Sequence, residues 1–563
     1  MKMTGSQIIM EILLEQGVDT VFGYPGGAAL NIYDTLYQYS DRIRHVLTAH
    51  EQGAAHAADG YARATGKTGV VFATSGPGAT NLVTGIATAF MDSIPMVAIT
   101  SNVANSLIGR DAFQEVYITG ITMPITKHNF FVNKIEDLAH AVREAFRIAA
   151  TGRKGPVLVD VTKDVSAALY EFEPKEAEHK VTMSTASDEE IQKIADMINQ
   201  AERPAIYCGG GVPASDAGHE LTELIHKADI PIAYTMMAVG IVGYNDTHSL
   251  GMIGMHGSVA ANKAVDQADL VLALGTRFSD RVALNTEKFA HRATKVQVDI
   301  DESEINKNVI VDMSVISDVK YFLEKLLPLV EEKKRTAWLE QVAVWRDASI
   351  ASQCPAAKMH PRDIIGAVCD MTDKETIYVT DVGQHQMWAA QYYKYKTPRT
   401  LLTSGGLGTM GYGLGAAIGA KMGRPDKTVV NIAGDGCFRM NMNEIATSVR
   451  SGNQLIEIVL NNHVLGMVRQ WQTLFYDHRY SHTILNDNVD FVKLAEAMGA
   501  EGIRVTKKEE VEPALKKALA SKGTVVLDCW IDQDLSVFPM VPAGANIDDV
   551  FDEEDMKKDG KSL

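Results

Sequence analysis

The sequence predicts an α/β protein made of three doubly wound domains, each with a parallel sheet. Short apolar runs typical of strands alternate with helical patterns along nearly the whole chain, for example at Gly69–Thr74, Pro156–Val161 and Leu270–Leu274. The chain has 563 residues, and at roughly 150 residues per domain this length suits three or four domains. The first and last thirds also share an order of elements, so we expect three domains with an internal duplication.

Two polar segments separate the predicted domains. The first linker, Tyr170–Lys180, is charged and contains Pro174, and the second, Glu331–Met359, is polar and helical and ends in Cys354-Pro355. We therefore expect domains at 1–170, 185–335 and 355–540, followed by an acidic tail at 541–563.

The composition indicates a globular protein with an acidic surface. Hydrophobic residues make up 46% of the chain and charged residues 22%, and the net charge is −17. That charge disfavours nucleic acid as a partner, because a phosphate backbone repels an acidic surface. No run of about 18 apolar residues predicts a membrane span. The chain opens without a signal-peptide pattern, and its five scattered cysteines form no CxxC pair, so we expect a cytoplasmic protein.

The first and third domains share a helix, a strand, a glycine turn and a second helix in the same order. In the first domain these lie at Gly60–Gly66, Val70–Ala73, Ser75–Gly78 and Ile86–Ala89. In the third they lie at Gly411–Gly419, Val429–Val430, Gly434–Gly436 and Ile445–Ser448. The match is either a coincidence or a duplicated α/β unit, which we favour. Two such units would hold one elongated cofactor between them.

A Gly-Asp-Gly motif at 434–436, with Asn462 following 27 residues after the aspartate, predicts a metal and diphosphate site. Both polar residues follow apolar runs, Val429–Ala433 and Leu455–Leu460, so we expect them at the carboxyl ends of two parallel strands, with a tight glycine turn after the first and a helix at Asn441–Val449. Their oxygens suit Mg²⁺ bound to a diphosphate, and glycines admit phosphate close to the backbone. The simpler alternative is an ordinary strand, turn and helix.

Glu51 is the candidate acid of the first domain. It lies in the segment Ala49–His56, where polar strand-end residues lead into a helix of small residues. Alone, it would be an ordinary first-turn glutamate favoured by the helix dipole. Beside a diphosphate site, a carboxylic acid facing the aminopyrimidine ring of thiamine would control the tautomeric form of that ring. The glycine turn Tyr24–Ala28 would let backbone approach the same ligand.

The chain resembles the catalytic large subunit of acetohydroxyacid synthase, also called acetolactate synthase, a family of thiamine-diphosphate enzymes. The resemblance runs from Ser6 to Pro542 and is carried by motifs in all three domains. These motifs are YPGGA at 24–28, HEQGAAH at 50–56, SGPGATN at 75–81, DAFQE at 111–115, ITKHN at 125–129, GMHG at 254–257, RFSDRV at 277–282, SGGLGTMGYGL at 404–414, GMVRQWQ at 466–472 and FYDHRYSHT at 475–483.

The resemblance implies three domains that bind the pyrimidine ring, FAD and the diphosphate in chain order. It implies that Glu51 controls the tautomer, that Met410 lies under the bend of the cofactor, and that Asp435 and Asn462 bind Mg²⁺ together with the backbone carbonyl of Val464. Taken alone, Met410 would more often be a core residue. Further residues implied to line the thiamine diphosphate are Gly26, Gly27, Val382, Gly383, Gln384, His385, Gly408, Gly434, Gly436 and Met467.

The segment 277–282 is implied to belong to an FAD site with a structural role. Two arginines and an aspartate around Phe278 suit a dinucleotide phosphate, although charges at a strand end are also common on ordinary surfaces. The residues implied to bind FAD are Arg153, Gly209, Gly210, Gly211, Thr235, Met255, His256, Gly275, Arg277, Arg281, Asp299 and Asp318.

The implied activity is decarboxylation of pyruvate and ligation of the remaining two carbons to a second pyruvate or to 2-ketobutyrate. This is the first common step of branched-chain amino-acid biosynthesis. Gln114 and Trp471 are implied to choose the second substrate, although a single tryptophan is as often a core residue. The expected partners are further copies of the chain, in a homodimer or homotetramer, and a small regulatory subunit.

Several related activities stay open as alternatives. A catabolic acetolactate synthase is disfavoured by the RFSDRV segment, and a glyoxylate carboligase by Glu51, because that relative lacks an acid there. A pyruvate oxidase would use FAD as a redox cofactor. An inactive regulatory or scaffold protein is disfavoured by the intact Glu51, Asp435 and Asn462. Departures from relatives occur at Val103–Ser106, Arg110, Thr162, Ser279 and Gly415, none of them an implied catalytic group.

Overall fold

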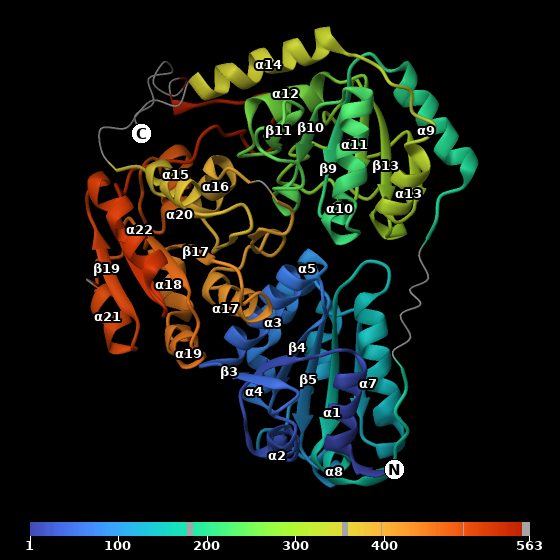
Figure 1. The fold of residues 1–563 in the computed structure, drawn as a ribbon, viewed down its shortest axis with the longest axis vertical. Coiled ribbons are helices and arrows are strands. Elements are labelled where there is room, and N and C mark those ends of the chain that lie inside the picture. The colour runs from blue at the N-terminus through green and yellow to red at the C-terminus, as the bar shows by residue number, and fades with distance from the viewer. Residues whose placement is uncertain (177–183, 352–358, 396, 488, 554, 556–563) are drawn as a thin grey trace.

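The computed structural model describes residues 1–176, 184–351, 359–395, 397–487, 489–553 and 555. It contains three α/β domains, each built on a sheet of six parallel strands. The predicted fold class is therefore confirmed. In Figure 1 the N-terminal domain lies at the bottom, the central domain at the upper right and the C-terminal domain at the left.

The N-terminal domain has the strand order β3-β2-β4-β5-β7-β6. Its strands are β2 (Thr20–Gly23), β3 (Arg44–Leu47), β4 (Gly69–Ala73), β5 (Met96–Asn102), β6 (His128–Val132) and β7 (Pro156–Thr162). Its helices are α1 (Gly5–Glu15), α2 (Leu30–Gln38), α3 (Glu51–Thr65), α4 (Pro77–Asn81), α5 (Val83–Asp92), α6 (Ile118–Thr122), α7 (Ile135–Ala150) and α8 (Lys163–Ala167). A small antiparallel pair, β1 (Lys2–Thr4) and β8 (Leu169–Glu171), joins the two ends of this domain.

The central domain has the strand order β11-β10-β9-β12-β13-β14. Its strands are β9 (Pro204–Cys208), β10 (Ile232–Tyr234), β11 (Ser249–Met252), β12 (Leu270–Leu274), β13 (Thr294–Asp299) and β14 (Met313–Ile316). Its helices are α9 (Asp188–Gln200), α10 (Gly211–Ala214), α11 (Gly218–Ala228), α12 (Val259–Gln267) and α13 (Val319–Leu326). Strands β9 and β12 are buried at every residue, as expected for inner strands of a covered parallel sheet.

The C-terminal domain has the strand order β16-β15-β17-β18-β20-β19. Its strands are β15 (Ile377–Thr380), β16 (Leu401–Leu402), β17 (Val429–Gly434), β18 (Ile456–Asn461), β19 (Glu501–Val505) and β20 (Val525–Trp530). Its helices are α15 (Pro361–Met371), α16 (Gln384–Tyr392), α17 (Gly413–Gly423), α18 (Asp435–Asn441), α19 (Glu444–Arg450), α20 (Gly466–Phe475), α21 (Phe491–Ala497) and α22 (Val511–Ala520).

The expected glycine turn directly after β17 is wrong, whereas the helix expected at 441–449 corresponds to α19. Helix α18 begins at Asp435, directly after the strand, and α19 follows separately from Glu444. Gly434 is the extended N-cap residue of α18, with φ −88° and ψ 156°. An aspartate is favoured in a first helical turn by the positive end of the helix dipole, which explains why the helix starts so early.

The domain boundaries remain predictions, but part of the second linker forms a helix. Helix α14 (Thr336–Ala351) occupies much of the second linker and lies along the central domain (Figure 1). The Cys354-Pro355 step, residues 177–180 of the first linker and tail residues 554 and 556–563 lie outside the described residues. Among the helices that the structure describes, none is long and apolar enough to cross a membrane.

The N-terminal and C-terminal domains meet where α3 packs against α17, at the centre of Figure 1. A methyl group on Gly60 would lie 2.1 Å from the carbonyl oxygen of Ala416, and one on Gly419 would lie 1.8 Å from that of Ala57. Only glycine fits at these two positions, so the small residues of both helices allow their backbones to touch. This close packing fixes the two domains relative to each other.

Candidate functional site

Asp435 and Asn462 lie at the carboxyl ends of two adjacent parallel strands. Strands β17 and β18 pair with Gly434 opposite Leu460, so the residues that follow each strand share one edge of the sheet. Asp435 is 1% exposed and Asn462 6% exposed. The Asn462 side-chain oxygen accepts a hydrogen bond from the Val464 backbone N–H at 3.2 Å, which holds the two residues together. The structure thus brings the three predicted metal ligands to one place.

Asp435 is a buried carboxylate with an unused oxygen. Across the described residues, its Oδ2 atom is buried and has no hydrogen-bond partner. Burial raises the pKa of the Asp435 carboxyl to about 7. A bound cation would stabilise the ionised form of this buried carboxylate. Oxygen ligands from Asp, Asn and a backbone carbonyl are those that Mg²⁺ prefers. The residues present therefore fit a magnesium ion.

Glycines open the space around this carboxylate. A methyl group on Gly434 would lie 2.9 Å from Nδ1 of His385, and one on Gly436 would lie 2.6 Å from the Leu465 side chain. His385 is buried, and burial lowers its pKa to about 3, so its imidazole is neutral. Within the described part of the chain its Nε2 atom is also without a partner. The glycines would let a diphosphate approach the backbone closely, and the unpaired His385 nitrogen would lie beside it, so these residues fit a diphosphate next to the metal.

Gln384 is held against the same edge. Its side-chain nitrogen donates to Oε1 of Gln470 at 3.0 Å and to the carbonyl of Leu535 at 2.8 Å. A methyl group on Gly466 would lie 2.0 Å from Gln384 Oε1. Gly383, which precedes it, has φ 148° and so needs to be glycine.

Met410 lies over the start of α18. Its terminal methyl group lies 3.9 Å from the position of a Cβ on Gly436. Gly408, in the same loop, has φ 69° and approaches Val382. Met467 is half-buried in the first turn of α20. The structure thus brings Met410, Gly408 and Val382 together near Asp435.

Asp381 is a functional candidate that was not predicted from the sequence. Its carboxylate accepts hydrogen bonds from the backbone N–H groups of Gly411 and Gly413, at 2.7 and 3.2 Å. Together with His385 and Cys437 it forms a buried group of potential metal ligands. Because both Asp381 oxygens already accept hydrogen bonds from backbone N–H groups, we assign Asp381 to holding the segment around Met410 and not to metal binding. An aspartate after an apolar strand at 377–380 was the available signal.

Glu51 is the first residue of α3, and its side chain lies in the N-terminal domain. The residue is 8% exposed. Its Oε2 atom accepts a hydrogen bond from the Asn81 side chain at 2.9 Å. A methyl group on Gly78 would lie 3.1 Å from the other oxygen, Oε1. One oxygen is therefore held by the protein, and the other lies beside a glycine that leaves room next to it.

Two further predicted groups lie near this glutamate. A methyl group on Gly26 would lie 2.4 Å from the Thr74 side chain. Gly76 approaches Gln114 closely, since a methyl group there would lie 2.9 Å from the Gln114 Cα atom. Gln114 has φ 60°, an uncommon conformation for a residue with a side chain. Gly27 starts a short 3-10 helix, and a Cβ there would meet nothing within 4 Å.

The predicted FAD residues gather at the carboxyl edge of the central sheet. Gly209–Gly211 follow β9, Gly275 follows β12, and a methyl group on Gly211 would lie 2.6 Å from the Gly275 Cα atom. Thr235 and His256, which follow β10 and β11, have buried atoms Oγ1 and Nδ1 that pair with no other described residue. Burial raises the pKa of Asp299, at the end of β13, to about 6. The glycine turns leave room for a ligand to approach the backbone, and the unpaired polar atoms could bind it. This edge of the sheet therefore fits an extended dinucleotide.

Other predicted FAD residues make structural contacts of their own. Asp318 caps α13 through the Tyr321 N–H at 3.0 Å. Arg153 is paired with Glu304 at 2.6 Å and with Asp301 at 3.2 Å. Arg281 is exposed and 3.8 Å from Asp280. Two more predicted positions lie beside the sheet edge: Met255 donates its N–H to the Arg281 carbonyl at 2.9 Å, and the Arg277 carbonyl accepts from the Asn308 side chain at 2.9 Å.

Trp471 lies on α20, away from the hydrophobic core. It is half-buried, and its ring centroid is 5.3 Å from that of Phe475. The neighbouring Arg469 is ion-paired with Asp534 at 2.6 Å. A partly exposed ring on a helix that begins beside Asn462 is consistent with a wall of the site.

Three segments match family models described as thiamine pyrophosphate enzyme domains. The N-terminal TPP binding domain matches residues 3–121, the central domain matches 191–326, and the C-terminal TPP binding domain matches 381–529.

Similar proteins include acetolactate synthase subunits from a yeast and from bacteria. The chain is 46% identical to the acetolactate synthase large subunit of Corynebacterium glutamicum, over 98% of the chain and 90% of the relative. It is 44% identical to the acetolactate synthase isozyme 2 large subunit of Escherichia coli, over 98% of the chain and 100% of the relative. It is 44% identical to the mitochondrial acetolactate synthase catalytic subunit of Saccharomyces cerevisiae, over 98% of the chain and 84% of the relative.

Proposed function

We propose that this chain, which belongs to the acetolactate synthase family of thiamine pyrophosphate enzymes, decarboxylates pyruvate and joins the remaining two carbons to a second 2-ketoacid. With two pyruvates the products are 2-acetolactate and carbon dioxide, and with 2-ketobutyrate the product is 2-aceto-2-hydroxybutyrate. The reaction is the first common step of branched-chain amino-acid biosynthesis. The observation that carries the proposal is the buried Asp435 carboxylate beside Asn462, whose Oδ2 atom pairs with no other described residue.

Thiamine diphosphate, when bound, supplies the carbon nucleophile and the electron sink for this decarboxylation. Asp435, Asn462 and the carbonyl oxygen of Val464 would hold Mg²⁺. The glycines at 434 and 436 and the neutral His385 would receive the diphosphate. Met410, whose methyl group lies 3.9 Å from the position of a Cβ on Gly436, would pack against the bend of the cofactor and support its shape.

Glu51 would hold and exchange a proton at the N1′ atom of the aminopyrimidine ring. Asn81 orients the carboxyl group through Oε2, which leaves Oε1 available beside Gly78. General acid–base catalysis needs a carboxyl group held within hydrogen-bond reach of the atom whose proton it exchanges.

The central domain would hold FAD in a structural role, because joining two ketoacids involves no net oxidation or reduction. Gly209–Gly211 and Gly275 would admit the dinucleotide, and Thr235 and His256 would pair with its polar groups. Arg277 and Arg281 would contact its phosphates. Arg153 has its guanidinium engaged by Glu304 and Asp301, so it would reach FAD only through a rearrangement of that pair.

The complete site would be shared between two copies of the chain. The Glu51 carboxylate is bound by Asn81 of its own domain, whereas Met410 and Asp435 lie together in the C-terminal domain. We propose a homodimer or homotetramer in which the Glu51 side of one copy faces the Asp435 side of another. The relatives named as large subunits imply a small regulatory subunit as a further partner.

One assay tests this function directly. Purified protein is incubated with pyruvate, with and without 2-ketobutyrate, in the presence or absence of thiamine diphosphate with Mg²⁺ and of FAD. We expect 2-acetolactate and 2-aceto-2-hydroxybutyrate only when thiamine diphosphate and Mg²⁺ are present. Reduction of FAD with acetate or acetyl phosphate as product would instead identify a pyruvate oxidase and overturn the proposal.

Trp471→Leu is expected to weaken the preference for 2-ketobutyrate while acetolactate formation continues. The indole ring would contact the extra methyl group of 2-ketobutyrate, and one such contact is worth about 1–3 kcal/mol of discrimination. The measurement is the product ratio from mixed substrates. Trp338→Leu is the matched control, because Trp338 lies in α14 of the second linker, where its ring meets that of Trp345 edge to face. An unchanged ratio in Trp471→Leu would rule out this role.

A further inference from the structure

Two buried carboxylates, Asp92 and Glu444, each bind two consecutive backbone N–H groups of the other terminal domain. Asp92 belongs to the N-terminal domain and Glu444 to the C-terminal domain. We propose that both are positioning residues. Asp92 fixes the turn of the C-terminal domain that leads to Met410, and Glu444 fixes the turn of the N-terminal domain that leads to Glu51. This inference rests on the proposed function in so far as Met410 and Glu51 face the cofactor.

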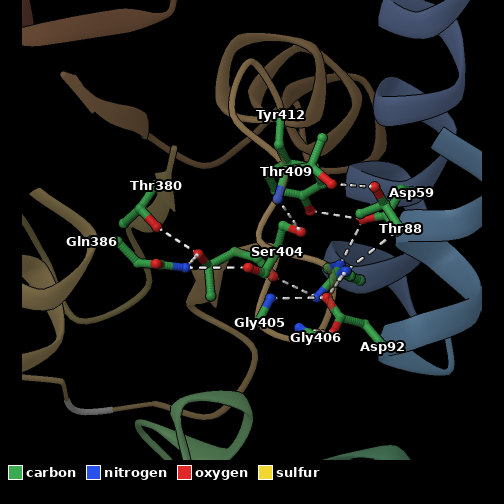
Figure 2. A network of polar contacts seen from close by, with 12 residues as sticks. Asp59, Thr88, Asp92, Thr380, Gln386, Ser404, Gly405, Gly406, Thr409 and Tyr412 are labelled. Carbon is green, nitrogen blue, oxygen red and sulfur yellow. Dashed lines mark hydrogen bonds and ion pairs between the residues drawn. The ribbon is translucent and has the colours of Figure 1, made fainter. Parts of the chain in front are cut away.

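Asp92, the last residue of α5, holds the glycine turn at 405–406. Its Oδ1 atom accepts a hydrogen bond from the Gly406 N–H at 2.6 Å, and its Oδ2 atom accepts one from the Gly405 N–H at 3.1 Å. The Asp92 side chain is 0% exposed. Figure 2 shows it pointing at this turn from α5. A methyl group on Gly406 would lie 2.8 Å from Asp92 Oδ1, so the contact requires glycine there.

Arg63 and Asp59, both on α3, extend the contact to the ends of the same loop. Arg63 pairs with Asp59 at 2.6 Å and with Asp92 at 2.8 Å, and it donates to the Thr403 carbonyl at 2.8 Å. Asp59 in turn accepts a hydrogen bond from the Tyr412 hydroxyl at 2.7 Å. One guanidinium thus serves two buried carboxylates, and the N–H and O–H donors of the C-terminal domain stabilise the remaining negative charge.

The segment 403–412, here called the Met410 loop, is therefore held on both sides of Met410. Thr88 adds a fourth anchor, since its hydroxyl oxygen lies 2.7 Å from that of Thr409 (Figure 2). The N-terminal domain anchors positions 403, 405, 406, 409 and 412. The C-terminal domain's own Thr380 and Gln386 bind Thr403, and Asp381 binds Gly411. Gly408 and Met410 lie between these anchors. A loop held in this way enters cofactor binding with its conformation already set.

Glu444 makes the reciprocal contact at the start of α3. Its Oε1 atom accepts from the His50 N–H at 3.0 Å and its Oε2 atom from the Ala49 N–H at 3.1 Å. Glu444 is 0% exposed, and Thr447 donates to it at 2.6 Å. A methyl group on Gly53 would lie 2.2 Å from Glu444 Oε1. Because Glu51 directly follows His50, this carboxylate sets where the candidate acid begins its helix.

Asp92→Asn and Glu444→Gln are the informative variants, because they keep side-chain size but replace one accepting oxygen with an NH₂ group. That group would face a backbone N–H, so one of the two hydrogen bonds is lost. Hydrogen–deuterium exchange is measured by mass spectrometry on the purified full-length chain without added cofactor. We expect exchange about 10-fold faster or more at 403–412 in Asp92→Asn and at 47–54 in Glu444→Gln, each in its own segment.

A second readout links the Met410 loop to ligand binding. Calorimetry with thiamine diphosphate and Mg²⁺ is expected to show an affinity about 10-fold lower for Asp92→Asn than for the natural chain. If the natural chain does not bind thiamine diphosphate, the proposed function fails, whereas the exchange data still decide whether the two carboxylates hold these turns.

Glu15→Gln is the matched control. Glu15 is a buried carboxylate at the end of α1, a helix that packs against α2, α7 and α8, and it is paired with Arg143 at 2.8 Å. It is expected to leave exchange at 403–412 and 47–54 unchanged. If Asp92→Asn does not fold, Thr88→Val removes the Thr409 contact, together with a hydrogen bond to the Thr84 carbonyl within α5. Of the two turns, only 403–412 is expected to exchange faster in this variant. Uniformly faster exchange along the chain, or unchanged exchange at both turns, would overturn the proposal.

Discussion

Replacing Glu51 with glutamine is expected to lower the rate of acetolactate formation by about 10²–10⁴-fold, the usual contribution of a general acid–base group. Glutamine matches the size of glutamate and keeps an oxygen for Asn81, which now donates to Glu51 at 2.9 Å. The fold and the binding of thiamine diphosphate should therefore persist. What is lost is the exchangeable carboxyl proton beside Gly78.

The decisive measurement is hydrogen–deuterium exchange at the thiazolium C2 position of bound thiamine diphosphate, followed by NMR. A large fall in that exchange rate, with unchanged cofactor affinity, is the expected result. Glu11→Gln serves as control, because Glu11 is a carboxylate of the same domain that binds the Tyr39 hydroxyl at 2.7 Å. Exchange at the natural rate in Glu51→Gln would show that this residue does not control the proton transfer.

The features that were predicted correctly are those that a local sequence pattern determines. Alternating apolar runs predicted the three parallel sheets, because strands buried on both faces are apolar throughout, as β4 and β9 are. Asp435 and Asn462 were predicted at one sheet edge because each follows such a run. Helix α18 was not predicted, because the glycines on both sides of Asp435 indicated a turn where the structure has the first turn of a helix.

Contacts between segments that are far apart in the chain could not be predicted from the sequence. Asp92 and Gly406 are 314 positions apart, and Glu444 and His50 are 394 apart. Nothing in the local sequence distinguishes Asp92 from an exposed aspartate at a helix end, or Glu444 from an ordinary first-turn glutamate. The glycine pairs that allow α3 to touch α17 were visible only as a high content of small residues. The roles of these residues depend on how the N-terminal and C-terminal domains pack against each other.

Asp435→Ala is expected to weaken Mg²⁺ and thiamine diphosphate binding together, each by at least about 100-fold, since even residues that only support a metal ligand contribute 10–100-fold. The metal would bridge the protein and the diphosphate, so losing its charged ligand removes both. Calorimetry with each ligand in the presence of the other tests this. Asp426→Ala is the matched control, because Asp426 is an exposed carboxylate of the same domain paired with Lys427 at 3.3 Å. Unchanged affinity for both ligands in Asp435→Ala would refute the metal site.

Mixing the two inactive variants tests whether Glu51 and Asp435 act from different copies of the chain. In a dimer whose sites are shared, a mixed pair of Glu51→Gln and Asp435→Ala chains has one site with both natural residues and one with neither. Random reassociation makes half of the dimers mixed, so about a quarter of the natural activity should return. A site built within one chain would leave every mixed dimer inactive, because each chain still lacks one residue. Recovery of activity on mixing therefore supports the shared site, and its absence, with mixed dimers demonstrated by mass spectrometry, would contradict it.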